Sequence, residues 1–374
     1  MSKIGFVRET DAPLLPPPPN SAGVHGWLRR NLFSSFGNSV LTIVLAALLA
    51  LIAWQIIGWA LIRAVWVGVD REACAVAGAG ACWPFVWAKF PQWLFGFYPI
   101  EERWRPVLTF LIGAAALVPM LMPSAPGKFW NALFLIVIYP LLALALLRGG
   151  VFGLVPVETA DWGGLLVTLV VSITGIAASL PLGIALALGR QSRMPVVRSL
   201  SIAFIELWRG VPLITVLFMA SVMLPLFFPA GTVLDKLLRV LIGISLFSAA
   251  YMAEAVRGGL QAIPKGQYEG AMALGLGWWP AMRLIILPQA LRISIPNIVG
   301  NFIGLFKDTT LVLIVGIYDF LGIISTSTQD AKWAAPETAN TGYFVAAIVF
   351  WAFCFGMSRY AMFTERRLDA GHRR

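Results

Sequence analysis

Residues 264–288 read PKGQYEGAMALGLGWWPAMRLIILP, and this stretch separates two long apolar segments of the chain. It predicts a short helix from about Pro264 to Leu274, because proline is tolerated at the first position of a helix. Gly275 can adopt the left-handed conformation that ends a helix, and Gly277 allows a second turn. We therefore predict a helix, a sharp turn and a re-entry into an apolar span.

The predicted short helix carries side chains that suit contact with another protein. Tyr268 and Met272 are four residues apart, so they share one face of a helix, and Glu269 lies beside them. An aromatic ring and a methionine on an outer face predict a projection for a partner. The alternative interpretation is an ordinary solvated loop between two spans.

The composition places the chain among membrane proteins. Of its 374 residues 59% are hydrophobic and 12% are charged, against about 25% charged in a typical soluble domain. Such a chain is an all-α polytopic membrane protein. The net charge of +10 does not indicate a nucleic-acid partner, because the basic residues stand at the ends of apolar spans, next to lipid headgroups.

The apolar runs predict about eight transmembrane helices, since some 20 apolar residues cross the hydrocarbon core. The expected spans are Val40–Ala60, Pro106–Gly127, Phe129–Leu147, Trp162–Gly189, Gly210–Leu234, Val240–Ala253, Ile293–Tyr318 and Thr338–Ser358. Excess lysine and arginine predicts that residues 190–209, residues 264–277 and the C-terminus lie in the cytoplasm.

The chain divides by texture into four expected regions. Residues 1–39 form a polar, proline-rich cytoplasmic tail, and residues 40–160 hold three spans with an outer loop at 63–104. A break near 148–161 precedes a five-span domain over 161–362, and 363–374 form a basic cytoplasmic tail.

The cysteines point to the outer loop. Cys74 and Cys82 lie there together, where oxidising conditions allow a small disulfide between them, while Cys354 lies in the last span and is expected to serve packing. No pattern of cysteine and histidine suggests a metal site, and we predict none.

Two charged residues lie inside an apolar run, where a charge is costly unless it is paired or faces water. Lys307 and Asp308, with Thr309 and Asn301, are candidates to line a path through the membrane. The alternative is a structural ion pair between helices. Pro288 and Pro296 favour a broken helix in this span.

Two further charge pairs stand near predicted span ends. Glu206 and Arg209 are three residues apart, and so are Glu254 and Arg257, so each pair can interact on a helix. The chain lacks GxxxxGK[ST], GxSxG and HExxH, so we predict no catalytic residues and no ATP site of its own.

The loop resembles the EAA loop of ATP-binding-cassette (ABC) importer membrane subunits. The positions that match at the family's spacing are Glu269, Ala271, Gly275, Ile285, Leu287 and Pro288. Gly270 stands where that pattern prefers alanine. The segments ELWRGVPL at 206–213 and LPQALRISIPNIVGNFIGLFKDTTL at 287–311 are also similar to those of the polar amino-acid branch. The order of tail, three spans and five spans resembles the second permease of general L-amino-acid transport systems.

The resemblance implies a type I importer permease domain over 161–362 in a bacterial inner membrane. Residues 264–277 would be its coupling helix, which docks on a cytoplasmic ATPase dimer that binds ATP and magnesium. The residues at this contact would be Tyr268, Glu269, Gly270, Ala271, Met272 and Gly275. A second permease, a periplasmic amino-acid-binding protein and an L-amino-acid substrate would complete the system.

Three other interpretations remain. An ion-coupled secondary amino-acid transporter would need a carboxylate in the membrane, for which Asp308 is the candidate, and an internal repeat, which we do not find. A lipid-modifying enzyme would need a polar catalytic cluster. A scaffold subunit would tolerate neutral residues at Lys307 and Asp308.

Overall fold

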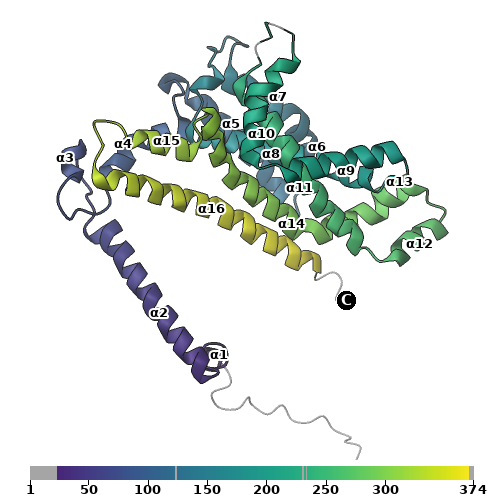
Figure 1. The fold of residues 1–374 in the computed structure, drawn as a ribbon, viewed down its shortest axis with the longest axis horizontal. Helices are drawn as coiled ribbons and strands as arrows, with labels where there is room; N and C mark the ends of the chain where they lie inside the picture. Colours follow the sequence, from purple (N-terminus) through teal and green to yellow (C-terminus); the bar gives the residue numbers. More distant parts are fainter. Residues whose placement is uncertain (1–22, 123, 230, 233, 370–374) are drawn as a thin grey trace, which may run out of the picture. The chain divides into compact units, whose positions relative to one another are not determined.

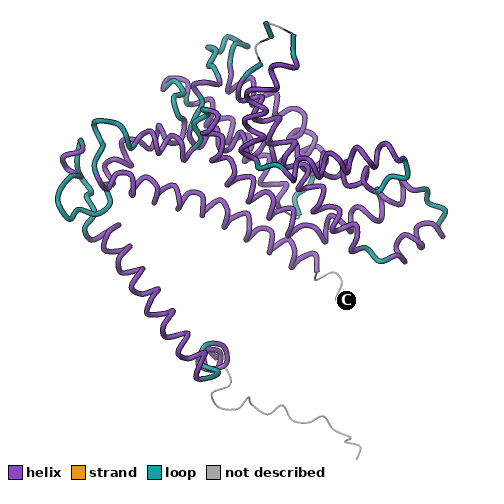
Figure 2. The backbone as a smooth tube through the Cα atoms, viewed as in Figure 1, coloured by secondary structure: helices purple, strands orange, loops and turns teal. Residues whose placement is uncertain are grey.

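The structure is a computed structural model that describes residues 23–122, 124–229, 231–232 and 234–369. Its described part is built from helices and connecting loops, and its backbone pairing outside helices is limited to isolated bridges (Figure 2). The helical class predicted from composition is therefore confirmed.

The chain divides into two compact units. Among the described residues, the first comprises 23–64 and 77–81, and the second comprises 65–76 and those from 82 to 369. The helices of the first unit are α1 (Gly23–Asn31), α2 (Phe36–Ile57) and the π-helical η1 (Gly58–Ile62).

The first unit contains one membrane span, Phe36–Ile62. The side chain of Ser35 caps α2 by accepting a hydrogen bond from the Asn38 N–H at 3.2 Å. The helix therefore begins at Phe36, four residues before the predicted start at Val40. The expected tail over residues 1–39 is partly helical, because α1 lies within it. Residues 1–22 of that tail lie outside the described part of the chain.

We call residues 65–76 and 82–99, which belong to the loop predicted to lie outside the membrane, the outer segment. In the second unit, two spans follow it. The first elements of this unit are α3 (Arg71–Cys74), α4 (Trp83–Phe95), η2 (Ile100–Glu102), α5 (Trp104–Leu121), α6 (Lys128–Leu133), η3 (Phe134–Ile138), α7 (Tyr139–Arg148) and η4 (Thr159–Asp161). The segments long and apolar enough to cross a membrane are Ile100–Leu121 and Lys128–Arg148.

The C-terminal helices follow in the same unit (Figure 1). They are α8 (Gly164–Arg190), α9 (Pro195–Gly210), α10 (Leu213–Phe218), η5 (Met219–Met223), η6 (Leu224–Phe227), α11 (Lys236–Ala262), α12 (Lys265–Ala273), α13 (Trp278–Ala281), η7 (Met282–Ile286), α14 (Leu287–Asp308), η8 (Thr309–Val315), α15 (Phe320–Ser327) and α16 (Pro336–Asp369). In Figure 1, α12 and α13 lie at one end of this unit, and α3, α4 and α15 lie at the other.

Among the described residues, 7 helices can span a membrane, or up to 8 if a bent pair counts as one span. That pair is Pro195–Gly210 with Leu213–Phe227, which meet at 105°. Pro212 cannot donate a backbone hydrogen bond and follows an extended Val211, so the helix ends there. The upper count agrees with the predicted number of spans.

The span predicted over Ile293–Tyr318 is longer than expected and is not broken where we predicted. It runs over Trp278–Val315, and α14 continues through Pro296. Pro288 lies in the first turn of α14, where proline is tolerated. The backbone changes instead to a π-helical turn before Leu287 and to a 3₁₀ helix after Asp308.

The two spans before residue 160 share a core with the helices after it. Tyr98, Leu147 and Trp162 belong to one buried apolar cluster with residues of α8, α10 and α11. Arg105 is fully buried, binds Glu102 at 2.7 Å and donates from both terminal nitrogens to the Val155 carbonyl at 2.8 Å. The boundary expected near 148–161 therefore lies inside one compact unit.

Candidate functional site

The loop that follows α11 folds as a short capped helix. Pro264 precedes α12 as its N-cap and Leu274 is its C-cap, so the helix agrees with the predicted one within a residue at each end. Gly275 has a φ of 74°, as its predicted left-handed role requires. The N–H of Gly275 donates to the Met272 carbonyl at 2.9 Å, and the Leu276 N–H donates to the Ala271 carbonyl at 3.1 Å. These two bonds form a Schellman motif, which satisfies carbonyls at the helix end.

The two sides of α12 have different environments. Ala271 is buried, and Tyr268 packs against a buried cluster formed by α8, α9, α11, η7 and α14. The Tyr268 hydroxyl donates to the Leu260 carbonyl at 3.4 Å, and burial raises the pKa of that hydroxyl above its usual value. Met272 is 64% exposed, while Glu269 and Gly270 are also exposed. The predicted projection of both Tyr268 and Met272 is therefore wrong for Tyr268, which anchors the helix instead.

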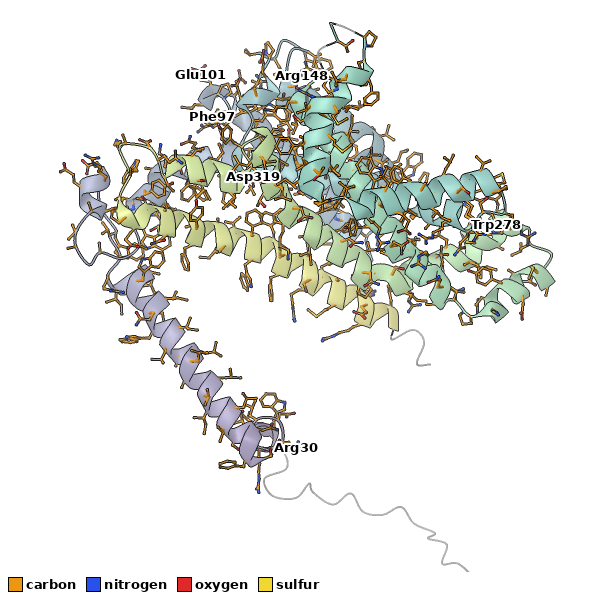
Figure 3. The ribbon with its side chains drawn as sticks, in the orientation of Figure 1. Arg30, Phe97, Glu101, Arg148, Trp278 and Asp319 are labelled. Atoms are coloured by element: carbon orange, nitrogen blue, oxygen red, sulfur yellow. A yellow bond between two sulfur atoms is a disulfide. The ribbon has the colours of Figure 1, made fainter. Side chains whose placement is uncertain are left out.

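Apolar side chains beyond the helix extend its exposed face. Leu274 is 77% exposed and Trp279 is 69% exposed. Trp278 and Trp279 lie edge to face with ring centroids 4.6 Å apart, and Figure 3 labels Trp278 at the end of the second unit that carries α12. We call Met272, Leu274 and Trp279 the exposed apolar face of the loop. The sequence signal for it is the pair of tryptophans directly after Gly277.

A cavity of about 280 Å³ lies between α8, α11 and α14. Its lining is Ser179, Phe247, Ser248, Tyr251, Met252, Gly300, Asn301, Phe302, Gly304, Leu305 and Asp308. The Asn301 amide donates to the Tyr251 carbonyl at 3.3 Å, which links α14 to α11. Asn301 and Asp308 are seven residues apart, so two helical turns bring them to the same face.

The other two candidates for a path do not line this cavity. Lys307 is exposed and points elsewhere, because successive residues of a helix are rotated by about 100°. Thr309 is fully buried, and its hydroxyl donates to the Phe306 carbonyl at 2.8 Å. None of the ion pairs among the described residues involves Lys307 or Asp308, so the structural ion pair is not formed. The sequence does not single out the serines and Tyr251 of the cavity, because they lie within long apolar runs.

Charged side chains gather where the ends of α8 and α9 meet α11. Glu254 binds Arg257 at 2.6 Å, Arg190 at 3.0 Å and Arg209 at 3.7 Å. Glu206 binds Arg190 at 3.1 Å. The predicted Glu254–Arg257 pair is confirmed, whereas the predicted Glu206–Arg209 pair is replaced by bonds between helices.

Sequence comparison gives the family. Residues 179–370 match the family described as "Binding-protein-dependent transport system inner membrane component". The chain is 50% identical to the inner membrane amino-acid ABC transporter permease protein YhdY of Escherichia coli (strain K12), over 95% of this chain and 97% of that one. This chain belongs to the family of binding-protein-dependent transport system inner membrane components. It is also 42% identical to the glutamate/glutamine/aspartate/asparagine transport system permease protein BztC of Rhodobacter capsulatus, over 100% of both chains.

A solved structure is similar to part of the chain. A crystal structure of an amino acid ABC transporter with histidines shares 26% identity, with a TM-score of 0.48, over 55% of this chain and 92% of that one. The YhdY and BztC matches also include the spans before residue 160, so this inner-membrane transport component shares its extra N-terminal spans with those two relatives.

The outer segment of this transport component is held by covalent and polar contacts. A disulfide joins Cys74 and Cys82, and the Cys82 N–H donates to the Thr341 hydroxyl of α16 at 2.9 Å. Lys89 of α4 pairs with Asp330, which lowers the pKa of that carboxyl. Within the described residues, no group of three or more His, Cys, Asp or Glu side chains could hold a metal ion.

Proposed function

We propose that this chain is the permease subunit of an ATP-driven importer of L-amino acids, which forms the translocation path and couples to a cytoplasmic ATPase through α12. The observation that carries the proposal is the α12 loop. It is anchored to the core by Tyr268, closed by Gly275 at φ 74°, and presents Met272 and Leu274 outward. The names of YhdY and BztC, both amino-acid transport permeases, support the substrate class.

The proposed partners follow from what the chain lacks and exposes. A dimer of cytoplasmic ATPases would bind ATP and magnesium, since no phosphate-binding GxxxxGK[ST] loop stands in this sequence. The chain itself is proposed to be non-catalytic. A second permease, taken to be a paralogue, would complete the membrane part, and a periplasmic amino-acid-binding protein would deliver substrate to the outer side.

The docking contact would use the exposed apolar face together with Glu269. Exposed apolar side chains that stand together on a loop favour a protein partner over water. Ala271 and Tyr268 hold the inner side of this helix against the core. Movement of the ATPases would then be passed to the spans through a helix that is firmly attached at one side.

The path would pass through the cavity between α8, α11 and α14. The Asp308 carboxylate can accept hydrogen bonds from the ammonium group of an amino acid, and Asn301 and Ser248 can bind its carboxylate. Lys307 and Thr309 are proposed as neighbours of the path, with Thr309 fixing the end of α14 through its bond to Phe306.

The test is purification of the tagged chain from its own membranes in native and Gly275→Pro forms. Proline fixes φ near −65° and cannot adopt 74°, so the variant should lose the ATPase and keep the second permease. Gly270→Ala is the matched control, since Gly270 is helical and a methyl group there meets open space. An ATPase retained equally by all three forms, or by none, contradicts the proposed docking role of α12.

Transport assays separate the remaining alternatives. An ion-coupled secondary transporter would keep its uptake when ATP is depleted and the ion gradient is intact, whereas the proposed importer would lose it. The relatives do not favour that alternative. A scaffold that lines no path would tolerate Asp308→Asn, whereas the proposed path predicts reduced uptake by an assembled complex.

A further inference from the structure

One carboxylate of α11 joins the ends of α8 and α9 in the second unit. Glu254 of α11 contacts Arg190, the last residue of α8, and Arg209, in the last turn of α9, as well as Arg257 of its own helix. The Glu254 side chain is 16% exposed, whereas its three partners are 25% to 36% exposed. We call these four residues the Glu254 node.

The node adjoins the cavity proposed as the translocation path. Tyr251 lines the cavity and lies one helical turn before Glu254 on α11. The Arg209 guanidinium stands over the Tyr251 ring, 5.8 Å from its centroid. A shift of the end of α9 relative to α11 would therefore displace Arg209 from the Tyr251 ring, which forms part of the cavity wall.

The node also adjoins the attachment of α12. The turns of α11 after Glu254 contribute Val256 and Leu260 to the buried cluster that receives Tyr268, and Ile263, directly after α11, belongs to the same cluster. The same cluster contains Ala187 of α8 and Ile205 of α9. Packed residues thus connect α12 through the last turns of α11 to the node. The node in turn attaches α8 and α9 to α11.

We propose that Glu254 is a positioning residue that makes the cytoplasmic ends of α8, α9 and α11 move as one body when α12 is displaced. The inference rests on the proposed function of α12. Without the carboxylate, Arg190 would keep its bond to Glu206, but Arg209 and Arg257 would lose the acidic group that they share, and the excess positive charge would push the helices apart. Displacement of α12 would then move α11 without carrying the walls of the cavity.

The test compares Glu254→Gln, Glu254→Asp and the native chain in the complex purified from native membranes and reconstituted in lipid vesicles. ATP hydrolysis and amino-acid uptake are measured on the same samples. Glu254→Gln should keep its partners and hydrolyse ATP within about twofold of the native rate. Its uptake per ATP should fall, by about 2- to 30-fold for a coupling change of 0.5–2 kcal/mol. Glu254→Asp keeps the charge and should recover most of that ratio.

The ratio of uptake to hydrolysis separates transmission from a merely structural role. A structural role would lower assembly, hydrolysis and uptake together and leave the ratio unchanged, which would overturn the inference. If Glu254→Gln fails to assemble, Arg190→Gln removes only the attachment of α8 and is judged by the same ratio. A native chain that retains no ATPase overturns the proposed function itself, whereas a coupled native complex with an equally coupled Gln variant overturns only this inference.

Discussion

At the scale of single residues, Gly275 carries the strictest backbone requirement in the α12 loop. Its φ of 74° places it in the left-handed region, which costs a residue with a Cβ atom about 1–2 kcal/mol. Space is not the constraint, because a Cβ atom there would meet nothing within 4 Å. The conformation alone therefore selects glycine at this position.

This requirement predicts opposite effects for two neighbouring glycines. Gly275→Ala should weaken the end of α12 and reduce ATPase retention by about fivefold to thirtyfold, the equivalent of 1–2 kcal/mol. Gly270→Ala should leave retention unchanged or improve it, since alanine favours a helix by about 1 kcal/mol over glycine. Both variants are compared by titrating purified ATPase against the permease in detergent. Equal retention by the two variants would contradict the argument.

Asp319 provides a prediction about pH. It is fully buried at the start of α15 and accepts hydrogen bonds from the N–H groups of Leu321 and Gly322 at 3.2 and 2.9 Å. Burial outweighs these bonds and raises the pKa of its carboxyl to about 6, from 3.8. Figure 3 labels Asp319 in the interior of the second unit.

Because the folded state holds this proton more tightly than the unfolded state, stability is fully present below about pH 4 and is lost as pH rises through about 6. The loss is roughly 2–3 kcal/mol. The melting temperature measured in detergent should therefore decrease as the pH is raised from about 4 to about 7. Asp319→Asn keeps a capping oxygen and should flatten this dependence.

Asp330 affects stability in a different pH range from Asp319. Its hydrogen bond from Lys89 lowers the pKa of its carboxyl, so its contribution is present above its ordinary pKa and is lost as pH falls below it. Acid destabilisation from Asp330 thus lies below the window of Asp319. A native melting temperature that stays level from about pH 4 to pH 7, or an Asn variant with the native profile, would show that Asp319 is not the group responsible.

At the scale of elements, α8 and α14 pack closely against α11 at glycines. A Cβ atom at Gly183 of α8 would lie 2.6 Å from the Cβ atom of Met252. A Cβ atom at Gly259 would lie 2.1 Å from the Ser294 hydroxyl and 2.3 Å from the Ala290 carbonyl of α14. Small residues let helices approach in membranes, where dispersion contacts rather than water drive their association.

Two adjacent glycines of α11 test this packing. Gly259→Ala should push α14 away and destabilise the protein by about 1–3 kcal/mol, the usual cost of overpacking. Gly258→Ala is the matched control, because a Cβ atom there meets nothing within 4 Å and alanine favours the helix. Thermal unfolding in detergent reports both. Similar melting temperatures for the two variants would argue against a tight crossing at Gly259.

These elements also show what the sequence could and could not reveal. The end of α12 was predictable, because the backbone demand on Gly275 is local. The inward direction of Tyr268 was not, because it depends on helices that meet only in the fold. Arg209 likewise pairs with Glu254, 45 positions further along by residue number, rather than with the nearby Glu206. Asn301 and Asp308 share a helix face, so their common cavity was within reach of periodicity alone, but the serines opposite them were not.

At the scale of the whole molecule, the two ends of the second unit have different chemistry. One end carries the Cys74–Cys82 disulfide, which forms in oxidising compartments. The other end carries α12 and the arginines near residues 190–209, which favour the cytoplasm. In Figure 3, Trp278 lies at the end of this unit that carries α12, and Glu101 and Arg148 lie away from it along the upper edge.

This polarity predicts the outcome of cysteine labelling. In a Cys354→Ser background, Val67→Cys should react with an impermeant maleimide in spheroplasts, because Val67 is 88% exposed in the outer segment. Leu274→Cys, at a site that is 77% exposed, should react only in inverted vesicles, and less when the ATPase is bound. The Cys354→Ser chain without an introduced cysteine controls for background labelling, because the disulfide-bonded Cys74 and Cys82 do not react with maleimide. Labelling of both positions from one side would contradict the orientation.

The binding of three arginines by the single carboxylate of Glu254 has a genetic consequence. Losing one of its arginines leaves the carboxylate paired with the other two, so Arg190, Arg209 and Arg257 should each tolerate replacement better than Glu254 does. Loss of the carboxylate, in contrast, leaves an excess of positive charge that removal of an arginine can relieve. Selection for restored growth of a Glu254→Gln strain on an imported amino acid should therefore yield second-site suppressors at those three arginines, scattered along the gene but adjacent in the protein.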